Sequence, residues 1–213
     1  MGELGKFERK LPEERRRALI EATLACLARE GHAGLSIRKI SQEAGISVGL
    51  INHHYASKDE LVGHAYETLS LGLLANIRDK VEAAGSDPRA RLSAYFRASL
   101  SAPVLERSTL RTWVVFWGMI DHSTIMTEVH DRTYGEYRRL LETLLADLWT
   151  ASGRPMPDLR LAAIGLIAIH DGLWLEWCLN PQTFSSEEAI GLCEQWTDAM
   201  LATQSVSGAV IQN

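Results

Sequence analysis

The chain has 213 residues, a formal net charge of −5 and three cysteines. This length provides for one small and one medium domain, and it is ample for a sizeable core. An odd number of cysteines without CxxC spacing indicates reduced thiols rather than a disulfide framework. The longest apolar run, Leu161 to Ile169, has nine residues, far short of the ~20 that a membrane span needs. The charged N-terminus lacks the apolar segment of a signal peptide, so we expect a cytoplasmic protein.

Charge is distributed unevenly along the chain. Residues 1–58 carry 10 Lys and Arg against 7 Asp and Glu, whereas residues 59–213 carry 12 against 20. A locally basic end on an acidic protein is typical of a module that binds phosphate groups, although an asymmetry of this size also occurs by chance.

The first predicted helix has an apolar face at helical spacing and ends at Gly31. The residues of this face are Ile20, Thr23, Leu24, Leu27 and Ala28. A basic segment, Arg15 to Arg17, precedes the helix, with Arg9 and Lys10 further upstream. This segment is either a solvated N-terminal arm or a contact for the phosphate backbone of DNA.

The segment that follows predicts two short helices joined by a tight turn, which is a helix-turn-helix. Ile37, Ile40 and Ala44 form an apolar stripe on the first of them, and Ser36 can cap its N-terminus. Gly45 permits the left-handed backbone that a tight turn between helices requires.

The second short helix begins after its cap, Ser47, and runs to about Tyr55. We expect Leu50, Ile51 and Tyr55 to face inward. The outward face then consists of Val48, Gly49, Asn52 and His53. An ordinary surface helix carries Glu and Lys at i,i+4 spacing, whereas these short or flat side chains can meet base edges.

From these positions we predict a DNA-binding surface. Its groove-facing residues are Val48, Gly49, Asn52 and His53. Its phosphate contacts are Ser36, Arg38, Ser47, Tyr55 and Lys58. A three-helix unit with a glycine turn also occurs in proteins that do not bind DNA, and an adaptor that binds partner helices remains the alternative.

The rest of the chain predicts helices throughout. Ser57 to Glu60 is a capping box that starts a long helix over residues 58–84, and Ser185 to Glu188 is another capping box. Further helices are expected at about 88–101, 104–120, 124–150, 158–179 and 186–203. The helix over 158–179 has apolar residues on more than one side, as expected of a helix that packs against a partner subunit. These residues are Leu161, Ile164, Ile167, Ile169, Leu173 and Leu175.

Aromatic residues beside carboxylates indicate a site for a small molecule. Trp113 and Trp117 are spaced i,i+4 with Asp121 one turn further, and Asp171 precedes Trp174 by one turn. Aromatic faces next to a carboxylate can bind a quaternary ammonium cation. The predicted effector residues are Trp113, Phe116, Trp117, Asp121, Tyr137, Asp171 and Trp174. The same aromatic residues could instead form the core or a dimer interface, and other amphipathic molecules would fit the same lining.

Metal binding and catalysis find little support. His122 and His130 are eight residues apart, too far for a paired i,i+4 metal site. We expect His170 to line a cavity or to lie in the core. The sequence has no phosphate-binding glycine loop and no HExxH motif. We therefore expect neither an enzyme nor a cofactor.

Residues 34–62, GLSIRKISQEAGISVGLINHHYASKDELV, resemble the DNA-binding domain of TetR-type transcriptional repressors, and RRRALIEATLACLAREG resembles their first helix. Two positions depart from the family pattern: Asn52 stands where most members have Tyr, and Ser41 where Ala is usual. A polar residue at position 52 is similar to the choline-responsive, Bet-type repressors. The segments LRTWVVFWGMIDHSTIMTEVHDRTYGEYRRLL and IHDGLWLEWCL resemble the effector domain of that subgroup.

The resemblance implies an all-α fold of about nine helices, a homodimer built on the last two long helices, and repression of an operator. We expect a helix-turn-helix domain over residues 1–57, an effector-binding and dimerisation domain over 58–204 and a loose tail over 205–213. Because the long helix belongs to both domains, an effector that tilts it would change the separation of the two DNA-reading helices. These must lie about 34–36 Å apart to enter successive major grooves.

Overall fold

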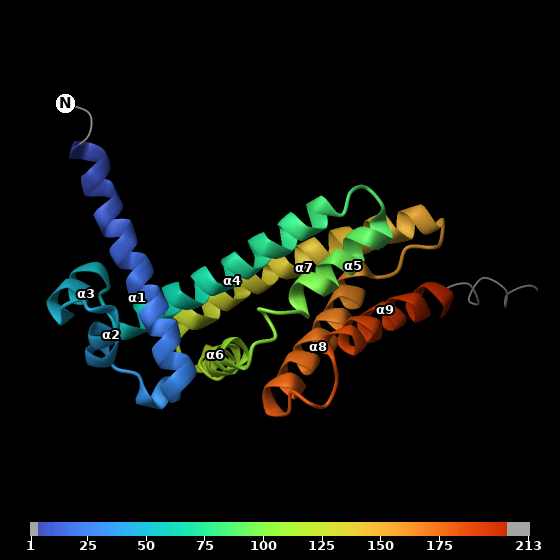
Figure 1. The fold of residues 1–213 in the computed structure, drawn as a ribbon. Coiled ribbons are helices and arrows are strands. Elements are labelled where there is room, and N and C mark those ends of the chain that lie inside the picture. The colour runs from blue at the N-terminus through green and yellow to red at the C-terminus, as the bar shows by residue number, and fades with distance from the viewer. Residues whose placement is uncertain (1–3, 204–213) are drawn as a thin grey trace, which may run out of the picture. The chain divides into compact units, whose positions relative to one another are not determined.

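The computed structural model describes the backbone of residues 4–203 and the side chains of residues 13–203, and every regular element in this part of the chain is helical. Figure 1 shows the order of the helices along the chain. The predicted all-α fold is therefore confirmed. The predicted tail over residues 205–213 lies outside the described residues.

Two compact units divide the chain. Unit 1 contains residues 1–71 and 111–132, and unit 2 contains residues 72–110 and 133–213. Unit 1 thus includes the start of the long helix and residues 111–132 in addition to the predicted 1–57 domain, and the predicted domain boundary stays a prediction.

Unit 1 begins with α1 (Leu4–Gly34), which is interrupted at Gly31 (φ 67°), where the sequence predicts the helix end. The basic segment Arg15 to Arg17 lies within α1 rather than ahead of it. The prediction of a basic arm before the first helix was therefore wrong, because helical backbone begins as early as Leu4. α2 (Ile37–Ala44) and α3 (Val48–His54) follow.

Salt bridges fasten α1 to α2. The Arg29 guanidinium is 3.0 Å from the Glu43 carboxylate, and the Lys39 ammonium pairs with Glu30 and donates to the Gly34 carbonyl at 2.8 Å. Beneath these exposed charges the core of the unit includes Leu19, Leu27 and Ile40, each at most 1% exposed. These exposed ion pairs contribute little to stability, and burial of apolar area supplies most of it.

Helix α4 (Lys58–Ala83) contributes its first part to unit 1 and its second part to unit 2. Its N-terminus forms the predicted capping box: Glu60 N–H donates to Ser57 Oγ at 3.0 Å, and the Glu60 carboxylate accepts from Ala56 N–H at 2.6 Å. In unit 1, Gly63 allows α4 to approach α7 closely, because a Cβ at this position would lie 2.7 Å from Ile125 Cγ2.

The remaining helices largely follow the predicted ranges. They are α5 (Pro88–Ser99), α6 (Arg107–Trp117), α7 (Thr124–Ser152), α8 (Leu159–Leu179) and α9 (Ser186–Thr203). Like α4, helices α6 and α7 have residues in both units. α6 is shorter than its predicted range, 104–120. Residues 104–106 form hydrogen-bonded turns on Ser101 and Pro103, and the short 3-10 helix η1 (Ile120–His122) follows α6.

In unit 2, α5 is tied to its neighbours by polar contacts. Arg89 makes a bidentate pair with Asp198 of α9 at 2.7 and 2.9 Å, and Ser93 donates to Glu194 of α9 at 2.6 Å. Arg91 pairs with Asp147 of α7 at 2.7 Å. These contacts place the inner face of α5 against a core that includes Tyr95 and Phe96.

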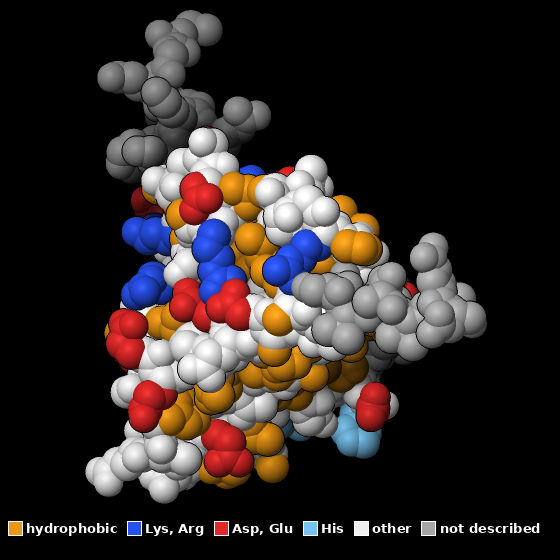
Figure 2. Space-filling model, turned by 90° about the vertical axis from the view of Figure 1, so that its right-hand side faces the viewer, with side chains coloured by type: hydrophobic (Ala, Val, Ile, Leu, Met, Phe, Trp, Pro, Cys, Tyr) orange, Lys and Arg blue, Asp and Glu red, His pale blue; other side chains and the backbone are white. Residues whose placement is uncertain are grey.

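Helix α8 combines a high apolar content with low burial. Among the described helices it alone is long and apolar enough to cross a membrane by length and composition, and 28% of its most apolar window is buried. Its exposed apolar side chains, together with one of α9, are Leu161 (55% exposed), Ile164 (38%), Leu175 (41%), Leu179 (67%) and Leu192 (49%). Hydrophobic side chains also gather on the face shown in Figure 2. An apolar surface of this kind marks a site of association.

Candidate functional site

The turn between α2 and α3 has the geometry that the sequence predicts. Ser36 Oγ accepts from Lys39 N–H at 3.3 Å, and Ser47 Oγ accepts from Leu50 N–H at 3.3 Å. Gly45 lies in the left-handed region (φ 65°, ψ 28°) and ends α2. Each short helix is therefore closed by the residue predicted to cap it, which confirms the helix-turn-helix.

Ser41, which stands where the family usually has Ala, makes a hydrogen bond that the sequence did not predict. Its hydroxyl donates to the Ile46 carbonyl at 2.6 Å, across the turn. Ile46 is the residue after Gly45, and its backbone N–H donates in turn to the Ser41 carbonyl at 3.1 Å. Ser41 and Ile46 are thus joined by two hydrogen bonds across the turn, one through the Ser41 hydroxyl and one through its backbone carbonyl. An Ala at this position would keep only the backbone hydrogen bond.

The outward face of α3 consists of the residues predicted for it. Ile51 is fully buried, whereas Val48 is 39% exposed and Gly49, Asn52 and His53 are also exposed. Leu50, predicted to face inward, is half-buried. The face carries no charged residue, so it presents an amide, an imidazole, a glycine backbone and a methyl surface at the positions predicted to meet base edges.

Four of the five predicted phosphate contacts either cap a helix or keep a cation without an ion-pair partner among the described residues. Ser36 and Ser47 cap α2 and α3, so their hydroxyls lie at helix N-termini, where backbone N–H groups favour anions. Arg38 is exposed and Lys58 is half-buried, and neither has an ion-pair partner among residues 13–203. Both cations thus remain available to phosphate groups.

Tyr55 does not suit the fifth predicted contact. Its side chain is 7% exposed, and its hydroxyl is hydrogen-bonded to His64 Nδ1 at 2.7 Å. Burial raises the pKa of Tyr55, so the hydroxyl stays neutral. The inward orientation of Tyr55 is confirmed, but the hydroxyl is engaged inside unit 1, and we withdraw this residue from the phosphate contacts.

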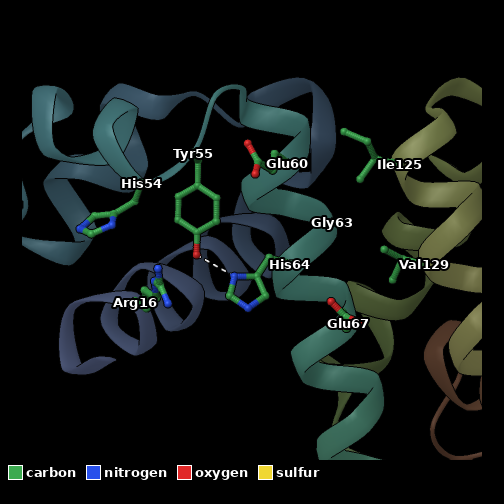
Figure 3. A pocket seen from close by; sticks show the side chains of 9 residues that line it. All are labelled: Arg16, His54, Tyr55, Glu60, Gly63, His64, Glu67, Ile125 and Val129. Carbon is green, nitrogen blue, oxygen red and sulfur yellow. Dashed lines mark hydrogen bonds between the residues drawn. The ribbon is translucent and has the colours of Figure 1, made fainter. Parts of the chain in front are cut away.

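A pocket of about 340 Å³ surrounds the Tyr55–His64 pair in unit 1. Figure 3 shows the lining side chains, which come from α1, α3, α4, α7 and the residue after α3: Arg16, His54, Tyr55, Glu60, Gly63, His64, Glu67, Ile125 and Val129. Its carboxylates already have partners, since Glu60 caps α4 and Glu67 pairs with Arg132 at 2.7 Å. None of the predicted effector residues lines this pocket.

The predicted effector residues are divided between the two units. In unit 1, Trp113 is 5% exposed and Phe116 is fully buried, while Trp117 is half-buried and Asp121 is exposed on η1. Tyr66 of α4 lies among these aromatic rings, with centroids 5.6 Å from Trp113 and 4.7 Å from Phe116. Its hydroxyl is hydrogen-bonded to His130 Nδ1 at 2.8 Å.

Tyr66 was absent from the predicted site because its own helix gives no hint of distant aromatic partners. His130, which the sequence offers as a weak metal candidate, is instead the polar partner of this tyrosine. Burial lowers the pKa of His130. Trp113 and Phe116 of α6 therefore form a packed cluster with Tyr66, as the alternative interpretation of their helical spacing expects.

In unit 2, the predicted residues Asp171 and Trp174 lie on α8, and Tyr137 is half-buried on α7. Trp174 is 5% exposed, and its indole N–H donates to the Ser99 carbonyl at 3.0 Å. The ring of His170 lies 4.6 Å from that of Trp174. Burial lowers the pKa of His170 to about 4 and raises that of Asp171 to about 7. Perturbed neighbours beside a fixed aromatic ring are typical of a functional site.

Comparison with known proteins agrees with the helix-turn-helix described above. A family model for bacterial regulatory proteins of the tetR family matches residues 19–65, and a model for the C-terminal region of BetI-type transcriptional repressors matches residues 88–202. The chain belongs to the TetR family. Its C-terminal region is of the BetI type, so this TetR-family chain is a DNA-binding transcriptional regulator. Proteins of such families are generally not enzymes.

Individual relatives agree with this membership. The TetR-family chain is 31% identical over 192 residues to the HTH-type transcriptional regulator BetI of Paraburkholderia phytofirmans, which covers 90% of this chain and 96% of that protein. A crystal structure of a transcriptional regulator from Pseudomonas aeruginosa has 48% identity and a TM-score of 0.85, covering 90% of this chain and 92% of that one. A regulator from Saccharomonospora viridis, solved in complex with choline, shares the fold at 20% identity and a TM-score of 0.76, covering 87% and 96%.

Proposed function

We propose that this regulator is a homodimeric, cytoplasmic repressor that leaves its operator when it binds a small cationic effector. The observation that carries the DNA-binding part is the exposed, uncharged face of α3. Ile51 anchors this face in the core, Ser47 caps the helix, and Val48, Gly49, Asn52 and His53 are exposed. A helix held in this way can enter the major groove with its polar edge toward the bases.

Phosphate contacts would fix the register of α3 on the DNA. Arg38 on α2 and Lys58 at the start of α4 supply charge, and the capped N-termini of α2 and α3 add backbone N–H groups. Contacts of this kind give affinity without base preference, so specificity rests on the exposed face of α3.

The proposed effector is a quaternary ammonium compound of the choline class. Asp171 and Trp174 place a carboxylate next to an aromatic ring on α8, and such a pair attracts a cation. The BetI-type family match over residues 88–202 and the choline complex of the Saccharomonospora viridis regulator favour the same class.

The exposed apolar residues of α8 and α9 support the homodimer. Leu161, Leu175, Leu179 and Leu192 are each more than 40% exposed in the single chain. Covering them by a second copy of the same helices would bury this apolar area in a two-fold interface. It would also account for the apolar character of α8 without a membrane.

The test is the binding of the purified protein to the DNA upstream of its own coding sequence, measured in a salt series with and without choline. We expect tight, salt-sensitive binding that choline weakens, because counterion release accompanies phosphate contacts. Tight binding that is indifferent to choline would retain the regulator and reject the effector class. Equal affinity for operator and unrelated DNA would contradict the repressor and favour an architectural protein or adaptor.

A further inference from the structure

Asp171 is a mostly buried carboxylate that lacks a compensating cation. Its side chain is 30% exposed, and within residues 13–203 its ion-pair contact is with His170, whose Nδ1 lies 3.6 Å from Oδ1. Within residues 13–203, no Lys or Arg comes within 4.0 Å of it, and it accepts no hydrogen bond. Carboxylates that are removed from water are normally paired, so an unpaired one indicates a missing partner.

The groups that face Asp171 are uncharged at neutral pH. On its own helix, His170 is held neutral because burial lowers its pKa to about 4. On α5, burial raises the pKa of Tyr95, whose side chain is 4% exposed and senses the charge of Asp171. On α9, Cys193 faces Tyr95, and burial raises its pKa to about 12. No fixed positive charge therefore offsets an ionised Asp171 from these three helices.

An aromatic side chain with a hydrogen-bonded indole lies one helical turn from this carboxylate. Trp174 lies one helical turn after Asp171, and its indole N–H is fixed on the Ser99 carbonyl at 3.0 Å. The ring of His170 lies against the same indole at 4.6 Å between ring centroids, with the two ring planes tilted by 51°. A cation that enters here meets an aromatic face and a single carboxylate, the two features that favour a quaternary ammonium group.

We propose that the effector enters this site in exchange for the proton of Asp171, so that effector binding is coupled to proton release. This inference rests on the proposed cationic effector. The permanent positive charge takes the place of the acid proton, which passes to solvent, and the net charge of the site is unchanged. Because the linkage is reciprocal, raising the pH promotes effector binding, and effector binding promotes ionisation of Asp171.

The size of the effect follows from the titration range of the carboxyl group. With a pKa of about 7, Asp171 is mostly protonated at pH 6 and mostly ionised at pH 8. Choline should therefore bind about tenfold more weakly at pH 6 than at pH 8. The uncharged isostere 3,3-dimethylbutan-1-ol has the same shape without the charge, and its affinity should not rise with pH.

The experiment is isothermal titration calorimetry of the full chain with choline and with 3,3-dimethylbutan-1-ol at pH 6, 7 and 8. Measurements in phosphate and in Tris, whose ionisation enthalpies differ, give the number of protons released. We expect about half a proton per choline at pH 7 and none for the isostere. Asp171→Asn should abolish both the pH dependence and the proton release. Glu176→Gln, an exposed carboxylate on the same helix, should preserve both.

Each other outcome has a definite meaning. Choline that binds equally well at pH 6 and pH 8 without proton release would overturn the exchange and leave the choline-class effector standing. Failure of choline to bind at any of these pH values would reject the effector class, and the exchange with it. If Asp171→Asn does not fold, the proposal is tested in the wild-type protein by carbon-13 NMR titration, which measures the pKa of the Asp171 carboxyl group with and without choline. A pKa that choline fails to lower would overturn the proposal.

Discussion

At the scale of single residues, His170 and Asp171 are sequence neighbours whose pKa values move in opposite directions. Burial lowers the pKa of His170 to about 4 and raises that of Asp171 to about 7, because burial disfavours the charged form of each group. Stability from neutral His170 is present above pH 6.5 and is lost as the pH falls toward 4. For Asp171, stability is lost as the pH rises from about 4 to about 7, because the unfolded carboxyl group is ionised over this range while the folded one stays protonated.

Asp171→Asn should therefore stabilise the protein more at pH 8 than at pH 5. The unfolded carboxyl group is ionised at both pH values, whereas the folded one stays protonated up to about pH 7, so Asp171 destabilises the fold by about 3 kcal/mol more at pH 8 than at pH 5. Denaturant unfolding at the two pH values measures the difference, and Glu176→Gln is the control because its side chain is exposed. A stabilisation of equal size at both pH values would contradict the shifted pKa.

Asn52 and Lys58 should affect DNA binding in different ways. Lys58→Ala should weaken binding to all sequences alike and flatten the salt slope by about one unit, because it removes one phosphate contact. Asn52→Ala should cost about 1–3 kcal/mol on the operator and relax the preference for one base pair. Fluorescence anisotropy on operator and mismatched duplexes measures both effects.

Lys80→Ala is the matched control for charge, since Lys80 is an exposed lysine on the unit 2 part of α4. It should change neither the salt slope nor the base preference. If both test variants keep the wild-type profile, α3 and its surroundings are not the DNA-reading surface.

The residue scale also shows where prediction from sequence ends. Caps such as Ser36 and Ser47 act on N–H groups three residues away, so local spacing reveals them. The partner of Tyr55 is His64, on another helix, and no local pattern distinguishes a hydroxyl engaged there from one offered to DNA. Local chemistry was predictable, and contacts between helices were not.

At the scale of helices, Gly63 permits α4 and α7 to pack closely in unit 1. Replacing a helical glycine by alanine normally stabilises a helix by about 1 kcal/mol. At position 63 the new methyl group would lie 2.7 Å from Ile125 Cγ2, and overpacking costs about 1–3 kcal/mol. Gly63→Ala should therefore fail to stabilise the protein, and it should stabilise an Ile125→Ala background by about 1 kcal/mol.

Gly72→Ala provides the control on the same helix, because a Cβ there meets no atom within 4 Å. It should stabilise the protein by about 1 kcal/mol in either background. Thermal unfolding of the four combinations at positions 63 and 125 gives the coupling energy. Additive effects at the two positions would show that α4 and α7 are not in close contact.

Helix positions were predictable because capping boxes and apolar periodicity act within a few residues. Residues 158–179 were predicted as a helix and form α8 from Leu159 to Leu179, whereas α6 begins at Arg107 rather than at residue 104. Turns on Ser101 and Pro103 compete with helix there, and hydrophobic periodicity does not register them. Trp113 and Phe116 of α6 also pack on Tyr66, and sequence spacing could not distinguish this packing from an effector pocket.

At the scale of the whole molecule, repression requires two reading helices spaced for successive major grooves, about 34–36 Å apart. α4, α6 and α7 each belong to both units, so a change in unit 2 can reach unit 1 through continuous helices. An effector bound beside Asp171 would favour one arrangement of these helices, and it releases DNA only if it binds that arrangement more tightly. The proposed dimer would supply the second reading helix, so the operator affinity would depend on dimerisation.

Leu175→Glu should convert the protein to a monomer and reduce its operator affinity. Leu175 is a 41% exposed residue on α8, and a glutamate there would place a charge in the proposed apolar interface. Loss of the second reading helix should cost at least tenfold in affinity, since each half-site is then bound alone. Leu71→Glu, at a 40% exposed leucine of α4, introduces the same charge elsewhere and should leave the dimer intact. Sedimentation velocity without detergent measures the oligomeric state of each variant. A dimer that survives Leu175→Glu would place the interface elsewhere. A wild-type protein that is soluble only in detergent would assign α8 to a membrane instead.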